Sequence, residues 1–219
     1  MVYTDRWNVY SNGTVAVGLD TVVKIIGTSS LAISVNNAAA QVNLVPTVTG
    51  GLPQPALRGK MRQVLRFVNL GGGRKIGFAA VQSARNITTS GSAYVAYIDG
   101  GTLFLAKTTT GLSGTLTTLA SIPFGPLVID TNYIFELEWN VDNAQLGGVD
   151  LLTKVIRLST FPVTEQYVET ALVFNIDKQL HHIDKTSPLL ATLGNGPIFI
   201  TPGSPSTVDV RYDATILYA

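Results

Sequence analysis

The sequence contains no cysteine and few charged residues. Of its 219 residues, 13% are charged, and the formal net charge at pH 7 is +1. Without cysteine the chain forms neither disulfide bridges nor cysteine-based zinc sites, so disulfide-stapled and zinc-stabilised small folds are excluded. The share of charged residues is about half that of an ordinary soluble domain. Such a surface gives little repulsion between molecules and favours association with a partner.

Long apolar runs and helical patterns are also missing. No stretch reaches 18 apolar residues free of charges, glycine and proline, so we expect no membrane-spanning helix and no membrane partner. Residues 1–7 lack the basic and apolar regions of a secretory signal, which predicts a protein made in the cytoplasm without a signal peptide. No window repeats apolar residues at helical spacing over three turns. The best candidate for a short helical turn is 178–183.

β-branched residues are abundant. Thr, Val and Ile account for 63 of the 219 residues, whereas Lys and Glu together number 11. Branched side chains pack well on a pleated surface, and Lys and Glu are the residues that solvated helix faces use freely. The composition therefore predicts an all-β protein with few short helical turns. With 46% hydrophobic residues, the chain is long enough to form one domain over residues 1–219.

Alternating patterns and turn residues locate the expected strands. Along 133–141, large apolar side chains alternate with an outward set of Ile134, Glu136, Glu138 and Asn140, which is typical of a strand with one buried face. Asp99-Gly100-Gly101 predicts a hairpin between 94–98 and 102–105, because these residues readily adopt positive φ angles. Gly71-Gly72-Gly73 predicts a second hairpin, between 64–70 and 75–81. Further strands are expected at 14–17, 22–26, 31–35, 116–121, 152–158, 172–176, 197–201 and 208–218, about a dozen in all.

Charges of opposite sign are concentrated in different parts of the chain. Between Asp20 and Asp99 there are eight basic residues and no acidic one, whereas from Asp99 onward there are 12 acidic and six basic residues. One interpretation is that the two parts face each other within one sandwich. The other is a dipolar subunit that is oriented against neighbouring copies or a larger scaffold. The basic part has few interleaved aromatic residues, so nucleic-acid binding is not expected.

The segment 36–58 shows no strand or helix pattern and contains three prolines. An irregular stretch of this length in a compact domain usually has a function. We interpret it as an interaction arm whose apolar side chains pack on a neighbouring subunit. The apolar members of the arm are Val42, Leu44, Val45, Val48, Leu52 and Leu57.

The order of the segments carries a resemblance to a known family. The matching segments are 5–7 as the start of a first strand, 65–68 followed by 76–80, the hairpin 94–107, 119–121, the strand 132–139 and the closing strand 210–216. In this order they resemble the concanavalin A-like jelly-roll superfamily, which includes lectins, glucanases and laminin-G-like domains. The resemblance implies an antiparallel two-sheet jelly-roll sandwich. A fold alone does not establish a function.

Glu136 and Glu138 are the candidates for a catalytic pair of carboxylates. Glycosidases of this superfamily carry catalytic carboxylates at alternate positions of one strand, and Glu136 and Glu138 have that spacing. However, Asn140 stands where the family has a further acid, and Glu138 stands where it usually has Asp. The pattern favours a solvated strand face, and glycoside hydrolysis is the third-ranked hypothesis.

Metal and cofactor motifs are weak. Asp142-Asn143 could contribute to a calcium site, but two adjacent residues are too few ligands and are common in turns. His181 and His182 point to opposite sides of an extended chain and receive no role. We therefore assign no catalytic, metal-binding or cofactor-binding residue and expect no cofactor.

Two functions from different classes remain. The preferred hypothesis is a non-enzymatic structural protein of a virus particle, similar to the capsid-decoration or tail subunits of tailed bacteriophages. It would form a homo-oligomer, with a trimer favoured, and bind a larger viral scaffold in the virion. The alternative is a lectin-like glycan-binding module, in which aromatic side chains stack on sugar rings. The candidate aromatic contacts are Trp7, Tyr94 and Tyr97.

Overall fold

The structure is a computed structural model that describes residues 7–22, 30–36, 39–46, 57–69, 74–141, 147–158, 178–190, 193–202 and 207–218. Its fourteen strands form two seven-stranded sheets. Sheet A contains, in spatial order, β1 (Trp7–Asn12), β4 (Ala39–Pro46), β13 (Gly194–Pro202), β6 (Lys75–Gln82), β7 (Ala93–Asp99), β8 (Thr102–Thr108) and β9 (Thr117–Pro123). Sheet B contains β12 (Lys178–Asp184), β11 (Val149–Leu158), β10 (Asn132–Asn140), β5 (Arg58–Asn69), β14 (Thr207–Tyr218), β3 (Ser30–Asn36) and β2 (Ala16–Asp20).

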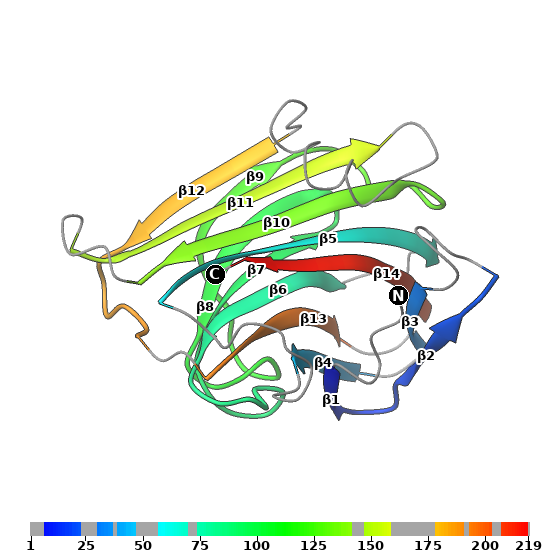
Figure 1. The fold of residues 1–219 in the computed structure, drawn as a ribbon, viewed down its shortest axis with the longest axis horizontal. Coiled ribbons are helices and arrows are strands. Elements are labelled where there is room, and N and C mark those ends of the chain that lie inside the picture. Colours follow the sequence, from blue (N-terminus) through cyan, green and yellow to red (C-terminus); the bar gives the residue numbers. More distant parts are fainter. Residues whose placement is uncertain are drawn as a thin grey trace.

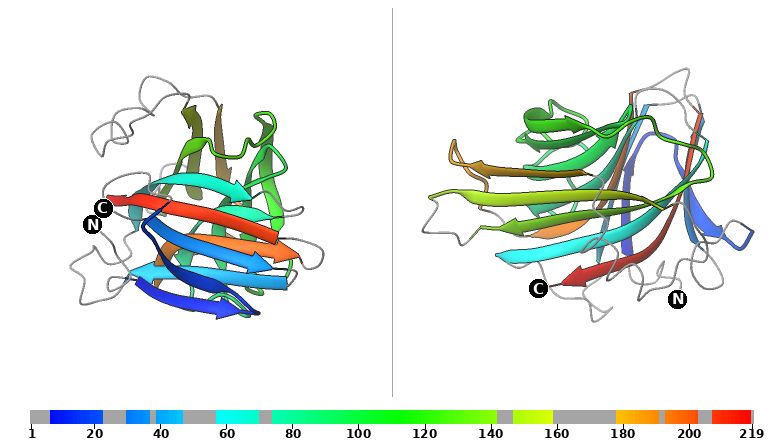
Figure 2. Two further views of the ribbon diagram at one scale, coloured as in Figure 1. Left: turned by 90° about the vertical axis from the view of Figure 1, so that its right-hand side faces the viewer. Right: turned by 90° about the horizontal axis from the view of Figure 1, so that it is seen from above.

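The two sheets are layers of one antiparallel sandwich. Figure 1 shows β12, β11, β10, β5 and β14 side by side in one layer, with β6, β13, β4 and β1 in the layer beneath. Figure 2 shows the same layers from two further directions. The described part of the chain contains no helix, and therefore none long and apolar enough to cross a membrane. The predicted all-β, antiparallel jelly-roll class is confirmed.

The main core lies between the sheets. On β10, Tyr133, Phe135, Leu137 and Trp139 all belong to this core, as the alternation along 133–141 predicts. Phe135 stacks on Phe78 of the opposite sheet, with ring centroids 5.2 Å apart. Within sheet B, Phe67 meets Tyr133 edge to face at 5.7 Å. These aromatic contacts contribute both buried area and the favourable geometry of ring pairs.

The hairpin prediction is right at one turn and wrong at the other. β7 and β8 pair directly, and Gly100 and Gly101 have φ angles of +54° and +84° at the turn, as the Asp-Gly-Gly signal indicates. In contrast, β5 lies in sheet B and β6 in sheet A, so these two strands do not form a hairpin. Each of these strands is central in its sheet and has neighbours on both sides. Their apolar patterns are therefore similar, although the strands do not pair.

Two further predictions are wrong, because segments without a clear strand pattern in the sequence form strands in the structure. The segment 178–183, expected to form a helical turn, lies in β12 at the edge of sheet B. The segment 36–58 is not irregular throughout, because residues 39–46 form β4 between β1 and β13. Val42, Leu44 and Val45 are buried in β4, with exposed fractions of 3% or less. They stabilise this subunit instead of reaching a neighbour.

The remaining residues of the proposed arm have different outcomes. Leu57, just before β5, is half exposed. Val48 and Leu52 lie outside the described residues. Among the described residues of the arm, Leu57 is therefore the one large apolar side chain that is exposed.

The basic and acidic parts of the chain meet within the sandwich. Arg62 pairs with Glu136, Arg66 with Asp130, and Lys75 with Asp99. Each pair joins the basic interval between Asp20 and Asp99 to the acidic part that begins at Asp99. The interpretation that the two parts face each other is confirmed for these pairs.

A buried polar cluster joins the two sheets along one side. Asp184 of β12 accepts hydrogen bonds from the Tyr94 hydroxyl of β7 and the Lys107 Nζ of β8, both at 2.8 Å. Its other oxygen accepts from the Thr186 backbone N–H at 3.0 Å. The Tyr94 oxygen in turn accepts from the Leu189 N–H at 3.0 Å. These hydrogen bonds connect β12 of sheet B to β7 and β8 of sheet A.

Candidate functional site

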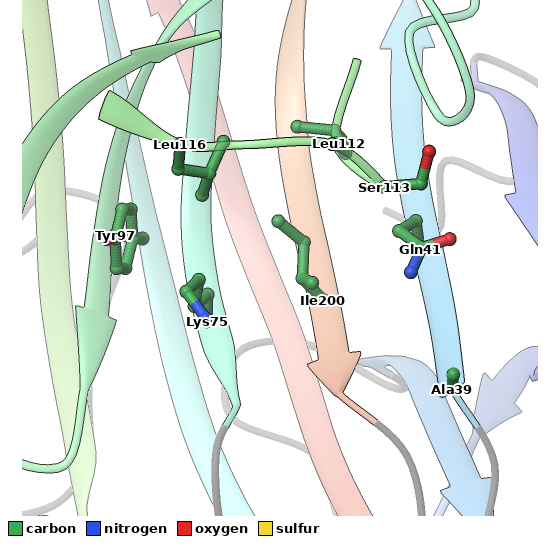
Figure 3. Close-up of a pocket in the computed structure, with 9 residues that line it drawn as sticks. Ala39, Gln41, Lys75, Tyr97, Leu112, Ser113, Leu116 and Ile200 are labelled. Atoms are coloured by element: carbon green, nitrogen blue, oxygen red, sulfur yellow. The ribbon is translucent and has the colours of Figure 1, made fainter. Parts of the chain in front are cut away.

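The outer face of sheet A contains a pocket of about 510 Å³. Its floor and walls come from β4, β6, β7 and β13, and residues 112–116 of the β8–β9 connection lie over one side (Figure 3). The lining residues are Ala39, Gln41, Lys75, Tyr97, Leu112, Ser113, Gly114, Leu116 and Ile200. We call this the sheet A pocket. It combines an aromatic ring, aliphatic side chains and a few polar groups, which is the usual composition of a site for a small ligand.

Polar side chains follow one line across sheet A beside the pocket. Lys75 and Gln41 flank Ile200, because Ile200 is paired with Lys75 on β6 and with Gln41 on β4. At one end of the line, the Lys75 Nζ lies 3.8 Å from the Asp99 carboxylate. At the other end, the Gln41 Oε1 accepts a hydrogen bond from Asn12 at 2.9 Å. The cross-strand register therefore brings together polar groups that are up to 87 residues apart in the sequence.

Tyr97 supplies the aromatic part of the pocket. Its ring stacks on Phe104 of β8, with centroids 4.9 Å apart, and the Lys75 Nζ lies 6.0 Å from its centroid. Burial, together with the nearby Asp99 carboxylate, raises the pKa of the Tyr97 hydroxyl, so this group is protonated at neutral pH. A protonated hydroxyl can both donate and accept a hydrogen bond.

The cover of the pocket is held by backbone hydrogen bonds. The N–H groups of Gly111, Leu112 and Ser113 donate to the carbonyls of Gly91, Ile87 and Thr88 at 2.7–3.0 Å. Leu112 and Ile87 also belong to a second apolar cluster, on the outer face of sheet A. The segment over the pocket is therefore fixed in place before a ligand arrives, which reduces the ordering cost of binding.

Gly111 is essential to this cover. Its φ is +87°, and a Cβ there would lie 2.4 Å from the Ser90 backbone nitrogen. We expect Gly111→Ala to lower the free energy of unfolding by about 1–3 kcal/mol, because the side chain would strain the backbone and push the two segments apart. Urea denaturation measures the effect. Gly18→Ala is the control, since a Cβ at Gly18 has nothing within 4 Å; equal stabilities of the two variants would contradict the prediction.

The structure places the three predicted glycan contacts in different environments. Tyr97 lines the sheet A pocket, although the residue as a whole is only 4% exposed. Tyr94 is fully buried in the core and bonded to Asp184, so its assignment as a glycan contact is wrong. Tyr94 and Tyr97 are three positions apart on β7, so their side chains face opposite sides of the strand, and that of Tyr94 faces the core between the sheets. Trp7 is the first residue of β1, and its side chain lies outside what the structure describes.

Most residues of the pocket were missed by sequence reasoning. Gln41 lies in the segment interpreted as an arm, and Lys75 adjoins a glycine run interpreted as a hairpin turn. Ile200 belongs to a predicted strand, but nothing in its surroundings indicated which strands it would join. The pairing of β4, β13 and β6 creates the pocket, and the sequence carries no local signal of that pairing.

The outer face of sheet B holds the carboxylate pair considered for catalysis. The alternation predicted that Glu136 is solvated, and this is wrong. Glu136 is fully buried on β10, between strands β5 and β11. Its carboxylate accepts hydrogen bonds from Arg62 at 2.5 and 2.8 Å and from Lys154 at 2.9 Å. Glu138, two residues along, is exposed. Because Arg62 and Lys154 both donate hydrogen bonds to the Glu136 carboxylate, Glu136 and Glu138 do not present two free acids to a glycan.

A smaller depression of about 80 Å³ is lined by Glu138, Asp150 and His181, among other residues. There the His181 Nε2 is 2.6 Å from an Asp150 carboxylate oxygen. The described residues contain no cluster of three or more His, Cys, Asp or Glu that could hold a metal ion. Asp142 and Asn143, the proposed calcium ligands, lie outside the described residues.

Comparison with solved structures finds proteins of similar fold. No family model matches the sequence, and no curated protein matches it. A PL-14 alginate lyase from Aplysia kurodai has a TM-score of 0.55 at 8% identity, covering 96% of this chain and 90% of its own. The carbohydrate-binding module CBM66 from Bacillus subtilis has a TM-score of 0.54 at 11% identity, covering 97% and 95%. The exoplasmic/lumenal domain of VIP36, in its Ca²⁺/Man3GlcNAc-bound form, has a TM-score of 0.54 at 9% identity, covering 100% and 84%.

These similarities establish a fold shared with a carbohydrate-binding module, an alginate lyase and a lumenal domain solved with Man3GlcNAc. They agree with the concanavalin A-like resemblance of the sequence. At such low identity they do not transfer any residue's role.

Proposed function

We propose that this protein binds carbohydrate in the sheet A pocket. The observation that carries the proposal is the position of the Tyr97 ring beside a line of hydrogen-bonding side chains, under a cover held by backbone bonds. A sugar has an apolar face of C–H groups and a rim of hydroxyls. Tyr97, Leu116 and Ile200 suit the apolar face, while the hydroxyls can bond to Gln41, Lys75 and Ser113.

The fold comparison gives separate support. A carbohydrate-binding module and a lumenal domain bound to Man3GlcNAc are among the similar structures, and both match along most of the chain. This support is at the level of fold, so the pocket has to be tested directly. It makes the lectin-like hypothesis better supported than the virus-particle hypothesis.

Gln41→Ala is the direct test of the pocket. Gln41 is partly exposed on β4, so the fold tolerates its truncation, but a bound sugar would lose a hydrogen-bonding partner. We expect the variant to weaken binding of the best ligand from a glycan array by about tenfold, which corresponds to about 1.4 kcal/mol. Isothermal titration calorimetry measures this change.

Gln179→Ala is the matched control. Gln179 is exposed on β12 of sheet B, remote from the pocket, and its truncation should leave the affinity unchanged. An array without any ligand, or equal affinities for the wild type and Gln41→Ala, would refute binding in this pocket. Mass spectrometry of the incubated glycan tests for cleavage, because an alginate lyase shares the fold; for a binding module we expect intact glycan.

The role in a virus particle remains a prediction from the sequence. Its main structural support was the apolar arm, and three of the six arm residues are buried within the subunit. The homotrimer, the viral scaffold and the location in a virion are tested by light scattering and by co-purification. A monomer that binds no capsid or tail component would rule this hypothesis out.

A further inference from the structure

The charges around the sheet A pocket are not balanced. Lys75 is the charged side chain among the described lining residues, and none of those residues is acidic. Asp99 faces Lys75 from the neighbouring strand, and Arg74 precedes Lys75 and interacts electrostatically with the same carboxylate. Two cations therefore share one anion, which leaves a net charge of +1 at this end of the pocket.

The ion pair between Lys75 and Asp99 is loose enough to be extended by a ligand. The two groups are 3.8 Å apart, longer than a direct hydrogen bond, and each side chain is 28% exposed. Lysine has three donors, so one contact to Asp99 leaves donors that can point into the pocket. Burial raises the pKa of Asp99, while the charges of Lys75 and Arg74 act to lower it, so both cations interact with this one carboxylate.

We infer that the sheet A pocket selects sugars that carry an anionic group, with Lys75 as the residue that pairs with it. The inference rests on the proposed carbohydrate binding and adds the class of sugar. A carboxylate or a sulfate ester would complete the charge balance with Lys75. The neutral groups of Gln41 and Ser113 would bond to ring hydroxyls, and Tyr97 would contact the sugar's apolar face.

The test uses matched sugars that differ only at C6. In each of the galactose, glucose and mannose series, the neutral sugar is compared with its uronate and its 6-sulfate by calorimetry at low ionic strength. We expect at least one series in which an anionic member binds about tenfold more tightly than the neutral one, as for a charge-assisted hydrogen bond. The uronate and sulfate arms identify which anion is preferred. The preference should weaken in 0.5 M salt, because the site is partly exposed.

Two variants should change this preference in opposite directions. Lys75→Gln removes the cation and should abolish the preference, so that the anionic and neutral members of a series bind the variant with similar affinity. Asp99→Asn removes the competing anion and should increase the preference by about threefold, a modest effect because the site is partly in contact with water. Lys178→Gln, an exposed lysine on β12, is the control and should behave as the wild type.

The outcomes separate the inference from the function on which it rests. If neutral sugars bind in the pocket as tightly as anionic ones, or if Lys75→Gln keeps the preference, the inference is wrong and the carbohydrate-binding function stands. If no sugar of any series binds and the glycan array is also empty, the proposed function is wrong and the inference fails with it.

Discussion

Replacing Glu136 by Gln is expected to lower the free energy of unfolding by about 3–5 kcal/mol. Glu136 is fully buried, and its carboxylate accepts hydrogen bonds from Arg62 and Lys154. Arg62 is itself only 3% exposed. The neutral amide would remove the buried negative charge that both cations share. Chemical denaturation monitored by circular dichroism measures the loss.

Glu138→Gln provides the control for this effect on the same strand. Glu138 is 48% exposed and lies 4.0 Å from Lys154, so its removal should cost less than about 1 kcal/mol. Combining Glu136→Gln with Arg62→Met should recover part of the stability, because one of the uncompensated cations is then absent. A Glu136→Gln variant as stable as Glu138→Gln would show that the ion cluster does not stabilise the sandwich.

Replacing Asp184 by Asn is expected to lower the free energy of unfolding by roughly 2–3 kcal/mol at neutral pH, the range of a hydrogen bond to a charged group. The Asp184 side chain is 2% exposed and bonds to Lys107 and Tyr94 across the sandwich. The amide would keep the geometry but lose the charge that Lys107 requires. Burial raises the pKa of Tyr94, so its hydroxyl stays protonated and continues to donate.

The effect of Asp184→Asn depends on pH. Burial alone would raise the pKa of Asp184, but the hydrogen bonds from Lys107, Tyr94 and Thr186 outweigh it and hold the pKa below its ordinary value. The carboxylate therefore contributes stability above the ordinary carboxyl pKa of about 3.9, and this contribution is lost as the pH falls through the lower pKa of the folded protein. The difference between wild type and Asp184→Asn should be constant from pH 7 to pH 5 and shrink below about pH 4.

Denaturation curves at several pH values measure this difference. Asp130→Asn is the control, because Asp130 is 64% exposed and pairs with Arg66 at the surface. Its cost should stay within about 1 kcal/mol at each pH. A difference for Asp184→Asn that stays unchanged down to pH 3 would contradict the assigned role of the charge.

Local patterns predicted the parts of the fold that depend on neighbouring residues. The alternation along β10 correctly identified Tyr133, Phe135, Leu137 and Trp139 as the buried face, because side chains alternate along any strand. Asp99-Gly100-Gly101 correctly located the β7–β8 hairpin, because the turn requires positive φ angles at its glycines. Of the pocket, the same reasoning identified Tyr97 alone.

The resemblance to the concanavalin A-like superfamily implied the antiparallel two-sheet sandwich. The sequence by itself determined that this protein is built from β-strands and has no disulfides. That result follows from composition, alternation and turn residues, which act over a few positions. Only the tertiary structure decided which strands are neighbours. It placed β5 and β6 in different sheets, β4 between β1 and β13, and Glu136 between two cations. The physical reason is that strand pairing is a long-range choice made by burial and register, and the sheet A pocket exists only after that choice.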